Sequence, residues 1–196
     1  TGSGNVTFSG IIGGGANGAI GALRVNSTGT TTFSSAVYAA SLITNIGGTT
    51  EINGGIVTTT GAQTYSDRVN LGASTLLIAS ALTTGNMLYA AGNNLTINVD
   101  AIALGYYTGG GEANSLILLP KTANTTIGIG SSATGTLALS DTELGYLNAG
   151  FRTITIGSDV GTGNISVNYA AASFVFDNAL ILRSATGNIT ATDALK

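Results

Sequence analysis

Apolar residues recur along the chain in pairs separated by one small or polar residue. Val6-Thr7-Phe8 and Ile165-Ser166-Val167 are examples. This alternation has the period of a β-strand with one buried face and one exposed face. Segments of this kind lie at 5–9, 23–26, 31–34, 76–78, 94–99, 116–119, 125–129, 136–139, 153–157, 164–168, 173–176, 180–182 and 188–191. The pattern predicts a chain built from short β-strands.

Gly, Asn, Thr and Ser fill the intervals between these segments, and such residues tolerate turns and left-handed backbone. Two or three of the predicted strands make a unit of roughly 20 to 25 residues, which suits one turn of a β-solenoid. We therefore expect an all-β, right-handed parallel β-helix. Residues 1–196 would form a single domain of this kind, or a segment of a longer repetitive chain.

An antiparallel β-sandwich is the alternative fold, because strands spaced every ~8 to 12 residues are also typical of sandwiches. The hairpin signals Asn17-Gly18 and Asn53-Gly54 are few for so many strands, however. Charged residues are also too sparse for the water-facing side of a sandwich. In the β-helix we expect these strand side chains to be buried: Ile154, Ile156, Ile165, Val167, Phe174, Phe176, Leu180 and Leu182.

The composition narrows the possible functions. Charged residues make up 8% of the chain and apolar residues 43%, and the net charge is −3. The six basic residues form no patch, which argues against nucleic-acid binding through phosphate neutralisation. No cysteine is present to form a disulfide. No apolar run reaches the ~18 residues expected of a membrane-spanning helix.

Two segments break the strand pattern. In Ser140–Leu147, Ser140 or Asp141 is placed to cap a helix, and Glu143 follows Ser140 by three residues. We expect a short helical turn near 140–147 that buries Leu144 and Leu147 against the coil. The second segment, Tyr106–Glu112, contains three consecutive glycines and is interpreted as a loop protruding from the stack.

Two stretches of the chain carry a family resemblance. The run from Gly48 to Ala73, and the run from Gly128 through Leu144 to Gly157, resemble repeat units of very large bacterial surface adhesins. These are the filamentous-haemagglutinin-like and autotransporter-type exoproteins, and the resemblance covers about 45–85 and 125–196. It implies a right-handed β-helix that is exported through an outer-membrane pore and displayed on the bacterial cell surface. It implies no catalytic residue.

Catalytic chemistry has little support in the residues. Ser–His and Cys–His pairs are impossible without His or Cys. Ser–Lys chemistry would need Lys121 or Lys196, and neither lies in a recognisable motif. Asp141 and Glu143 form the closest acidic pair, which the helix cap already explains. The remaining acids weighed for a β-helical lyase are isolated in sequence: Asp100, Glu112, Asp159 and Asp177. We expect no catalytic, cofactor-binding or metal-binding residue.

Neither the metal-binding patterns nor the glycosylation triplets of the sequence indicate a functional site. Gly109-Gly110-Gly111-Glu112 lacks the spacing of the calcium-binding β-roll repeat, and zinc is disfavoured by the missing His and Cys ligands. Asn-x-Ser/Thr triplets begin at Asn5, Asn26, Asn94, Asn124, Asn164 and Asn188. Chance explains them in a chain so rich in these residues.

These observations favour a non-enzymatic, structural or adhesive β-solenoid of an extracellular bacterial surface protein or fibre. A carbohydrate-active β-helix enzyme is one alternative, which a lateral acidic cluster would support. An ice-binding solenoid is another, suggested by the runs Thr30–Thr32 and Thr58–Thr60, although Thr-x-Thr does not recur regularly.

The expected partners follow from the ends of the pattern. Alternation begins at Asn5 and is still running at Ala191, and the first residues lack the features of a signal peptide. We expect the coil to continue into flanking repeats of a longer polypeptide or to stack end to end as a filament. A host or matrix glycan or protein is a possible ligand, and nucleic acid is not expected.

Overall fold

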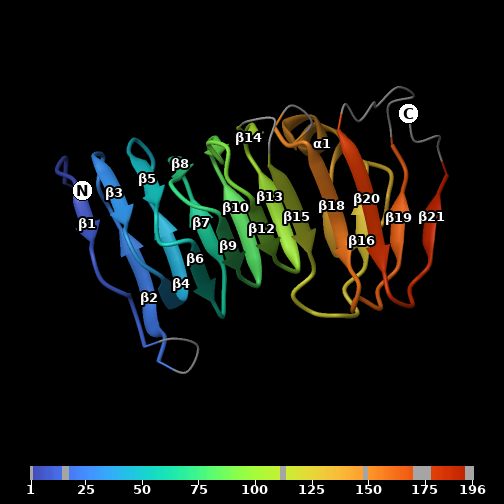
Figure 1. Cartoon of the computed structure of the whole chain (residues 1–196), viewed down its shortest axis with the longest axis horizontal. Coiled ribbons are helices and arrows are strands. Elements are labelled where there is room, and N and C mark those ends of the chain that lie inside the picture. Colours follow the sequence, from blue (N-terminus) through green and yellow to red (C-terminus); the bar gives the residue numbers. More distant parts are fainter. Residues whose placement is uncertain (1, 15–17, 111–113, 148–149, 170–177, 193–196) are drawn as a thin grey trace.

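The computed structural model describes residues 2–14, 18–110, 114–147, 150–169 and 178–192, and about half of these residues lie in β-strands. Every pairing between the described strands is parallel. The chain is therefore a parallel β-helix, and the antiparallel sandwich is ruled out. Figure 1 shows the strands of successive coils side by side along the long axis of the molecule.

The strands form three sheets. The first contains β1 (Val6–Phe8), β3 (Thr30–Phe33), β5 (Thr49–Ile52), β8 (Arg68–Leu71), β11 (Leu88–Tyr89) and β14 (Thr108–Gly109) in that order. The third contains β17 (Leu137–Leu139), β16 (Ile127–Ile129), β19 (Ile165–Val167) and β21 (Ile189–Ala191).

The second sheet divides at its longest strand, β4 (Val37–Thr44). The first half of β4 pairs with a long arm: β6 (Ile56–Thr59), β9 (Thr75–Ile78), β12 (Leu95–Asn98), β15 (Ser115–Leu119), β18 (Thr153–Ser158) and β20 (Ala179–Ser184). The second half pairs with a short arm: β7 (Gln63–Tyr65), β10 (Ala81–Thr84) and β13 (Ala101–Leu104). The strand β2 (Ile20–Val25) pairs with β4 as well.

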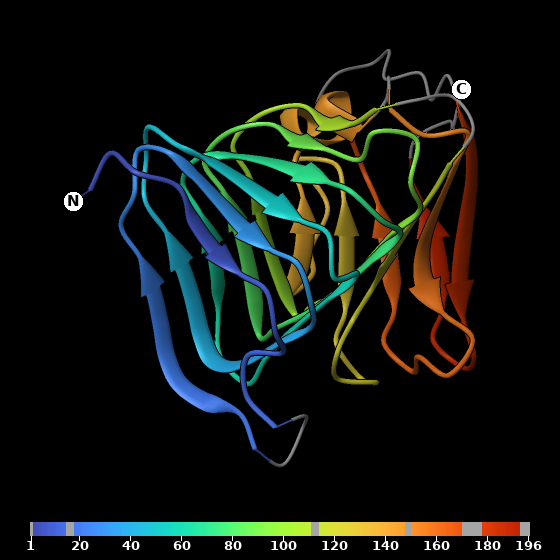
Figure 2. The same cartoon turned by 60° about the vertical axis from the view of Figure 1, so that its left-hand side comes forward.

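Each regular coil contains one strand of the first sheet, one of the long arm and one of the short arm, as in β5, β6 and β7. Hydrogen-bonded residues of neighbouring coils lie 19 residues apart at Glu51 and Asn70 and 21 apart at Asn94 and Ser115. Register partners lie 19 residues apart at Thr30 and Thr49 but 26 apart at Thr153 and Ala179, so the coil lengths scatter around the predicted range. Figure 2 looks more nearly along the axis and shows the chain winding through these coils.

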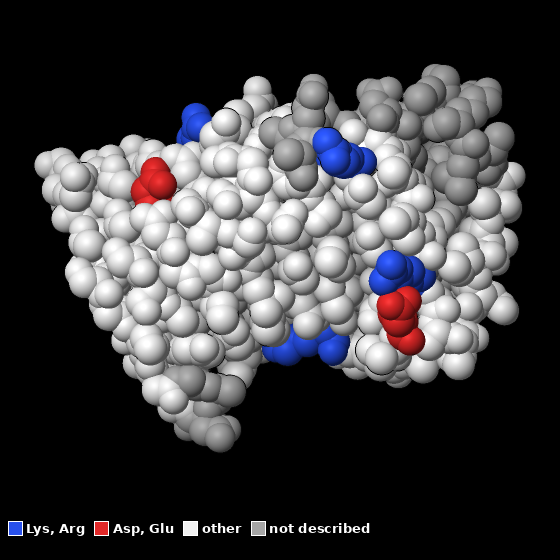
Figure 3. Space-filling model, viewed as in Figure 1, with Lys and Arg blue, Asp and Glu red and all other residues white. Residues whose placement is uncertain are grey.

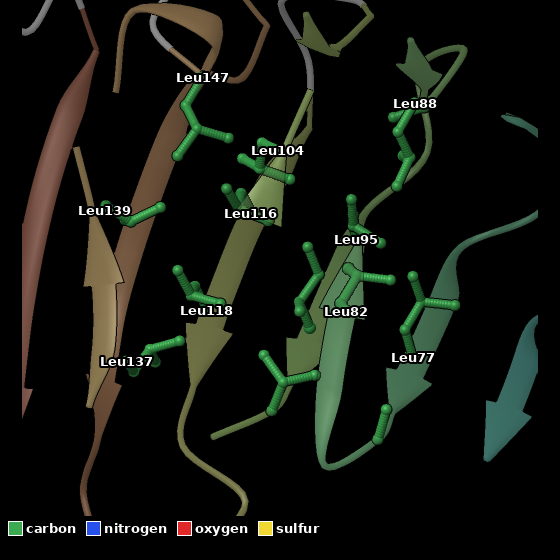
Figure 4. Packing of buried hydrophobic residues seen from close by; sticks show 14 of the residues in the cluster. Leu77, Leu82, Leu88, Leu95, Leu104, Leu116, Leu118, Leu137, Leu139 and Leu147 are labelled. Carbon is green, nitrogen blue, oxygen red and sulfur yellow. The ribbon is translucent and has the colours of Figure 1, made fainter. Parts of the chain in front are cut away.

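The core is a single column of inward-facing side chains that runs through the stack. Alternate residues of each strand point inward, so that Leu77, Leu95 and Leu116 are fully buried on successive strands of the long arm. Figure 4 shows the labelled leucines of neighbouring coils converging on this shared interior. Such burial contributes about 25 cal/mol per Å² of apolar surface removed from water. The stacked leucines therefore hold successive coils together.

The predicted core is confirmed in its central part. Ile154, Ile156, Ile165 and Val167 are buried. Leu180 and Leu182 face the core but are only half-buried, so the prediction of full burial is wrong for them. They lie on β20, which pairs with β18 alone, and no described strand covers their other side. Phe174 and Phe176 lie outside the described residues.

One coil is much larger than the others. Ser115 pairs with Thr153, and the chain between them holds β16, β17 and the helix α1 (Asp141–Leu147). The first sheet ends at β14, beside which α1 packs, and β17 of the third sheet packs beside β13. The helix predicted near 140–147 is confirmed, and Leu144 and Leu147 are buried as expected. It fills the position where the first sheet stops.

Two turn predictions need correction. The segment Tyr106–Glu112 is not simply a protruding loop, because Thr108–Gly109 forms β14 and Thr108 is fully buried. Residues 111–113 lie outside the described part of the chain. The signal Asn53-Gly54 joins β5 to β6, which do not pair with each other, so it makes a corner of the coil and not a hairpin. Asn17 also lies outside the described residues.

Candidate functional site

The acidic pair singled out in the sequence forms a helix cap. Glu143 Oε2 accepts hydrogen bonds from the Ser140 N–H at 2.9 Å and from the Ser140 hydroxyl at 2.7 Å, and the Glu143 N–H donates to Ser140 Oγ at 3.3 Å. This is the reciprocal capping box that the sequence predicted. Glu143 Oε1 also accepts the N–H of Leu104 at 2.9 Å, and this contact ties α1 to β13. Asp141 Oδ1 accepts the N–H of Ser131 at 2.8 Å.

The other carboxylates weighed for catalysis lie apart from one another. Asp159 forms an ion pair with Arg183 at 2.9 Å on the surface. Asp100 accepts hydrogen bonds from Thr122 and Thr125. Glu112 and Asp177 lie outside the described residues, as does Lys196. Within the described ranges, no three His, Cys, Asp or Glu side chains gather as a metal site would require.

Sequence reasoning missed one buried acid. Asp67 lies at the corner between β7 and β8 with 2% of its surface exposed. It accepts the hydroxyls of Thr44 at 2.7 Å and of Thr50 at 3.0 Å, and both threonines are buried. Burial raises the pKa of Asp67, and the threonine hydrogen bonds only partly offset this effect. Ser66-Asp67 resembles an ordinary surface turn in the sequence, so no local signal marks the burial.

Three of the six Asn-x-Ser/Thr triplets share a structural role in the coil. Asn5, Asn94 and Asn164 each stand immediately before a strand, and each side-chain oxygen accepts a backbone N–H of the next coil. These contacts measure 2.9, 3.0 and 2.9 Å. An inward apolar residue and an outward Thr or Ser follow each asparagine. The triplet is therefore a unit of the coil, in which Asn joins two coils at a corner.

Neither threonine run continues as a ladder. In the second sheet, Thr58 of the run Thr58–Thr60 pairs with Tyr38 on one side and Ile78 on the other. The run Thr30–Thr32 lies in the first sheet. Thr30 and Thr32 on β3 pair with Thr49 and Glu51 on β5. The next strand, β8, presents an arginine and an asparagine at these outward positions. The regular Thr-x-Thr face that would support ice binding is therefore interrupted after one coil of the described chain.

The two ends of the described coil remain uncovered. At the C-terminal end, Ile189 on β21 continues the inward ladder of Ile127 and Ile165. Ile127 and Ile165 are 3% and 1% exposed, whereas Ile189 is 47% exposed. Nothing but its position in the last coil distinguishes Ile189 from these two.

The N-terminal end mirrors this arrangement. Phe8 on β1 is half-buried, while its paired residue Phe33 is fully buried and stacks on it with ring centroids 5.3 Å apart. Leu23 on β2 is likewise half-buried, and its partner Leu42 on β4 is fully buried. Each end thus presents partly exposed core residues and strands that pair on one side only. Such edges can add a further parallel coil.

Comparison with known proteins identifies no relative. No family model matches the chain, and no curated protein or solved structure is significantly similar to it. The adhesin-like resemblance of 45–85 and 125–196 therefore stays a prediction. No helix in the described part of the chain is both long and apolar enough to cross a membrane.

Proposed function

We propose that the chain is a stiff structural rod of an extracellular bacterial surface protein or fibre, and that its open ends join further coils. The observation that carries this proposal is the exposure of inward residues at both ends. Ile189 at one end and Leu23 at the other occupy core positions without a covering coil. Further coils could come from flanking repeats of a longer polypeptide or from a second copy of this chain.

An added coil would bury the partly exposed core residues at either end. A half-exposed Leu, Ile or Phe gains roughly 1 kcal/mol or more when the rest of its surface is covered. An added parallel strand would also pair the free N–H and C=O groups of β1 and β2 at one end and of β20 and β21 at the other. Low surface charge opposes this association little.

Location and ligand follow from the sequence resemblance alone. If the chain is an adhesin-like exoprotein, it reaches the cell surface through an outer-membrane export pore and projects a host- or matrix-binding region. The coil would then act mechanically, because parallel strand pairing between neighbouring coils recurs along the axis of the described rod.

Substitution at one end tests the association. We expect the purified chain to form species longer than a monomer as its concentration rises, measured by multi-angle light scattering and electron microscopy. Ile189→Lys should abolish these species, because it places a charge in the contact between coils. The matched control is Ile181→Lys, which changes an outward residue with 37% exposure in the same terminal coil and should leave association unchanged.

A monodisperse monomer at all concentrations would leave flanking repeats as the only partner consistent with the proposal. In that case, fusing a second copy in tandem should raise the thermal stability of the joined ends. A tandem protein that melts like the single chain, together with a monomeric single chain, would refute the proposal.

A further inference from the structure

Two cavities lie over the outer face of the second sheet and form an interrupted trough, with Lys121 lining both. One ladder of register partners lines its floor, consisting of Tyr38, Thr58, Ile78, Asn98 and Leu119 on β4, β6, β9, β12 and β15. Adjacent strands lie ~4.8 Å apart, so five strands span about 19 Å. A cavity of about 220 Å³ lies at the Tyr38 end and one of about 150 Å³ at the Leu119 end. We call the whole feature the Lys121 trough.

The Lys121 side chain reaches back over earlier coils. Its Nζ donates to the backbone oxygens of Thr59 at 3.3 Å and Thr60 at 3.4 Å. An ammonium group has three N–H donors, so one remains for a ligand in the trough. Among the described residues, Lys121 has no carboxylate at ion-pair distance. Its positive charge is held in place by two neutral acceptors only.

The segment that carries Lys121 is held in place by Asp100. The Asp100 carboxylate accepts the N–H of Thr122 at 2.8 Å and its hydroxyl at 2.6 Å, and the hydroxyl of Thr125 at 2.8 Å. Burial alone would raise the pKa of Asp100, but these hydrogen bonds outweigh it and lower the pKa. Asp100 therefore stays ionised and engaged with its own loop, which positions Lys121 before any ligand arrives.

The rest of the trough offers an apolar surface and hydroxyl groups. Tyr38 and Ile78 line the larger cavity together with Thr58 and Thr60. Charged side chains are few on the face of the molecule seen in Figure 3, in keeping with the 8% of charged residues in the chain.

An unused hydrogen-bonding group lies in the smaller cavity. Asn98 lines it, and Asn98 Oδ1 is buried without a hydrogen-bond partner in the described structure. An unsatisfied buried acceptor destabilises the fold, so such groups call for an explanation. Rotation of the amide into the cavity would bring this oxygen to a ligand hydroxyl.

We propose that the Lys121 trough binds an acidic polysaccharide, through sugar residues that bear a carboxylate. The carboxylate pairs with Lys121, a pyranose ring packs on Tyr38, and a sugar hydroxyl donates to Asn98. A uronic acid carries a carboxylate, a flat apolar ring face and hydroxyl groups. The five strands under the trough span about 19 Å, which accommodates several such sugar units. This inference goes beyond the structural rod and does not depend on association of its ends.

The test uses two probes with the same backbone. A β-1,4-linked tetramer of glucuronic acid and the neutral glucose tetramer differ only in a carboxylate against a hydroxymethyl group. We expect calorimetry to detect binding of the acidic tetramer, at least tenfold tighter than that of the neutral one and weakened by salt. Lys121→Met should remove this preference, and Tyr38→Ala should weaken binding of the acidic tetramer severalfold.

Arg183→Met is the matched control, because it removes a surface cation that is already paired with Asp159. It should leave binding unchanged, and melting curves of all variants will show whether they remain folded. Tyr38→Phe keeps the ring and should bind like the wild type. Equal binding of both tetramers, no binding of the acidic one, or an unaffected Lys121→Met variant would overturn the proposal. Preferential binding of a tetraglutamate peptide would also overturn it, in favour of a protein ligand.

Discussion

The buried carboxylate of Asp67 gives the sharpest test of how the coil tolerates polar groups. Its side chain accepts the hydroxyls of Thr44 and Thr50 and its own backbone N–H. Tyr65 lies near enough for the charge of Asp67 to affect the titration of the phenol. Burial, and after it the charge of Asp67, raises the pKa of Tyr65. We expect Asp67→Asn to keep or increase stability at neutral pH, because it removes a buried charge and retains a hydrogen-bonding side chain of the same size. Asp67→Leu should destabilise the chain.

The magnitude follows from the two threonines. Asp67→Leu leaves two buried hydroxyls without an acceptor, and each such group costs about 1–3 kcal/mol. The total loss is therefore about 2–6 kcal/mol, or on the order of 10 °C in the melting temperature of a chain this size. Asp67→Asn avoids this loss because its amide can still accept one hydroxyl and donate to the other. It also removes the penalty of about 1.4 kcal/mol for each unit by which the pKa is raised.

The pH dependence has a defined sign. Because the folded-state pKa of Asp67 is raised, its contribution to stability is fully present below its unfolded value of about 3.9. That contribution is lost as the pH rises through the higher folded-state pKa. The stability difference between Asp67→Asn and the wild type should therefore grow in favour of the variant from about pH 4 upward and then level off.

Thermal and urea unfolding, followed by circular dichroism over this pH range, measures the effect. Comparing the two proteins at each pH cancels the contributions of other acids such as Asp100, whose pKa is shifted in the opposite direction. If Asp67→Asn loses as much stability as Asp67→Leu at every pH, burial of charge is not what governs this corner, and the reasoning fails.

Three further predictions concern local structure. Ser140→Ala should lower the free energy of unfolding by about 0.5–2 kcal/mol, because it removes the cap of α1. Glu143→Ala should lower it more but leave end-to-end assembly unchanged. A Glu143→Ala variant that loses assembly at an unchanged melting temperature would contradict this prediction. Gly157→Ala should lower the free energy of unfolding by more than ~1 kcal/mol in a urea titration, because the φ of Gly157 is +97° and a Cβ would lie 2.0 Å from a backbone oxygen of β20. Gly145→Ala is the control: its Cβ would meet no atom within 4 Å, so in the same titration it should raise the free energy of unfolding by about 0.5–1 kcal/mol. Asn94→Ala should cost about 1 kcal/mol, and hydrogen exchange should show a loss of protection at the Ser115 amide that it now binds.

The β-helix could be predicted because apolar and polar residues alternate in the sequence wherever the inward positions of a strand are aliphatic. Val6, Leu95 and Ile165 all precede an outward Thr or Ser. The strands between 37 and 71 were largely absent from the prediction because their inward residues include Thr50, Thr59 and Gln63, which are polar yet buried. Hydrogen bonds inside the coil allow these polar residues to be buried, and such hydrogen bonds cannot be predicted from the pattern of hydrophobic residues.

The helix cap could be predicted because its residues are neighbours in sequence. The candidate sites could not be, because each unites distant parts of the chain. Asp67 meets Thr44 across 23 residues, and Lys121 meets Thr59 across 62. Sequence reasoning weighed Lys121 only as a catalytic base, since nothing near position 121 reveals the carbonyl groups to which it binds.

The enlarged coil divides the rod mechanically. The first sheet ends at β14 and the third begins at β17, so only the second sheet carries strand pairing across this coil, from β12 through β15 to β18. Under axial tension, the coils before it share the load over three ladders of hydrogen bonds and those after it over two. The junction between this coil and the preceding one has only the β12–β15 ladder, supported by the packing of α1 and β17. We expect the rod to part here first in a pulling experiment, which would make the helix-bearing coil a mechanical fuse between two stiffer segments.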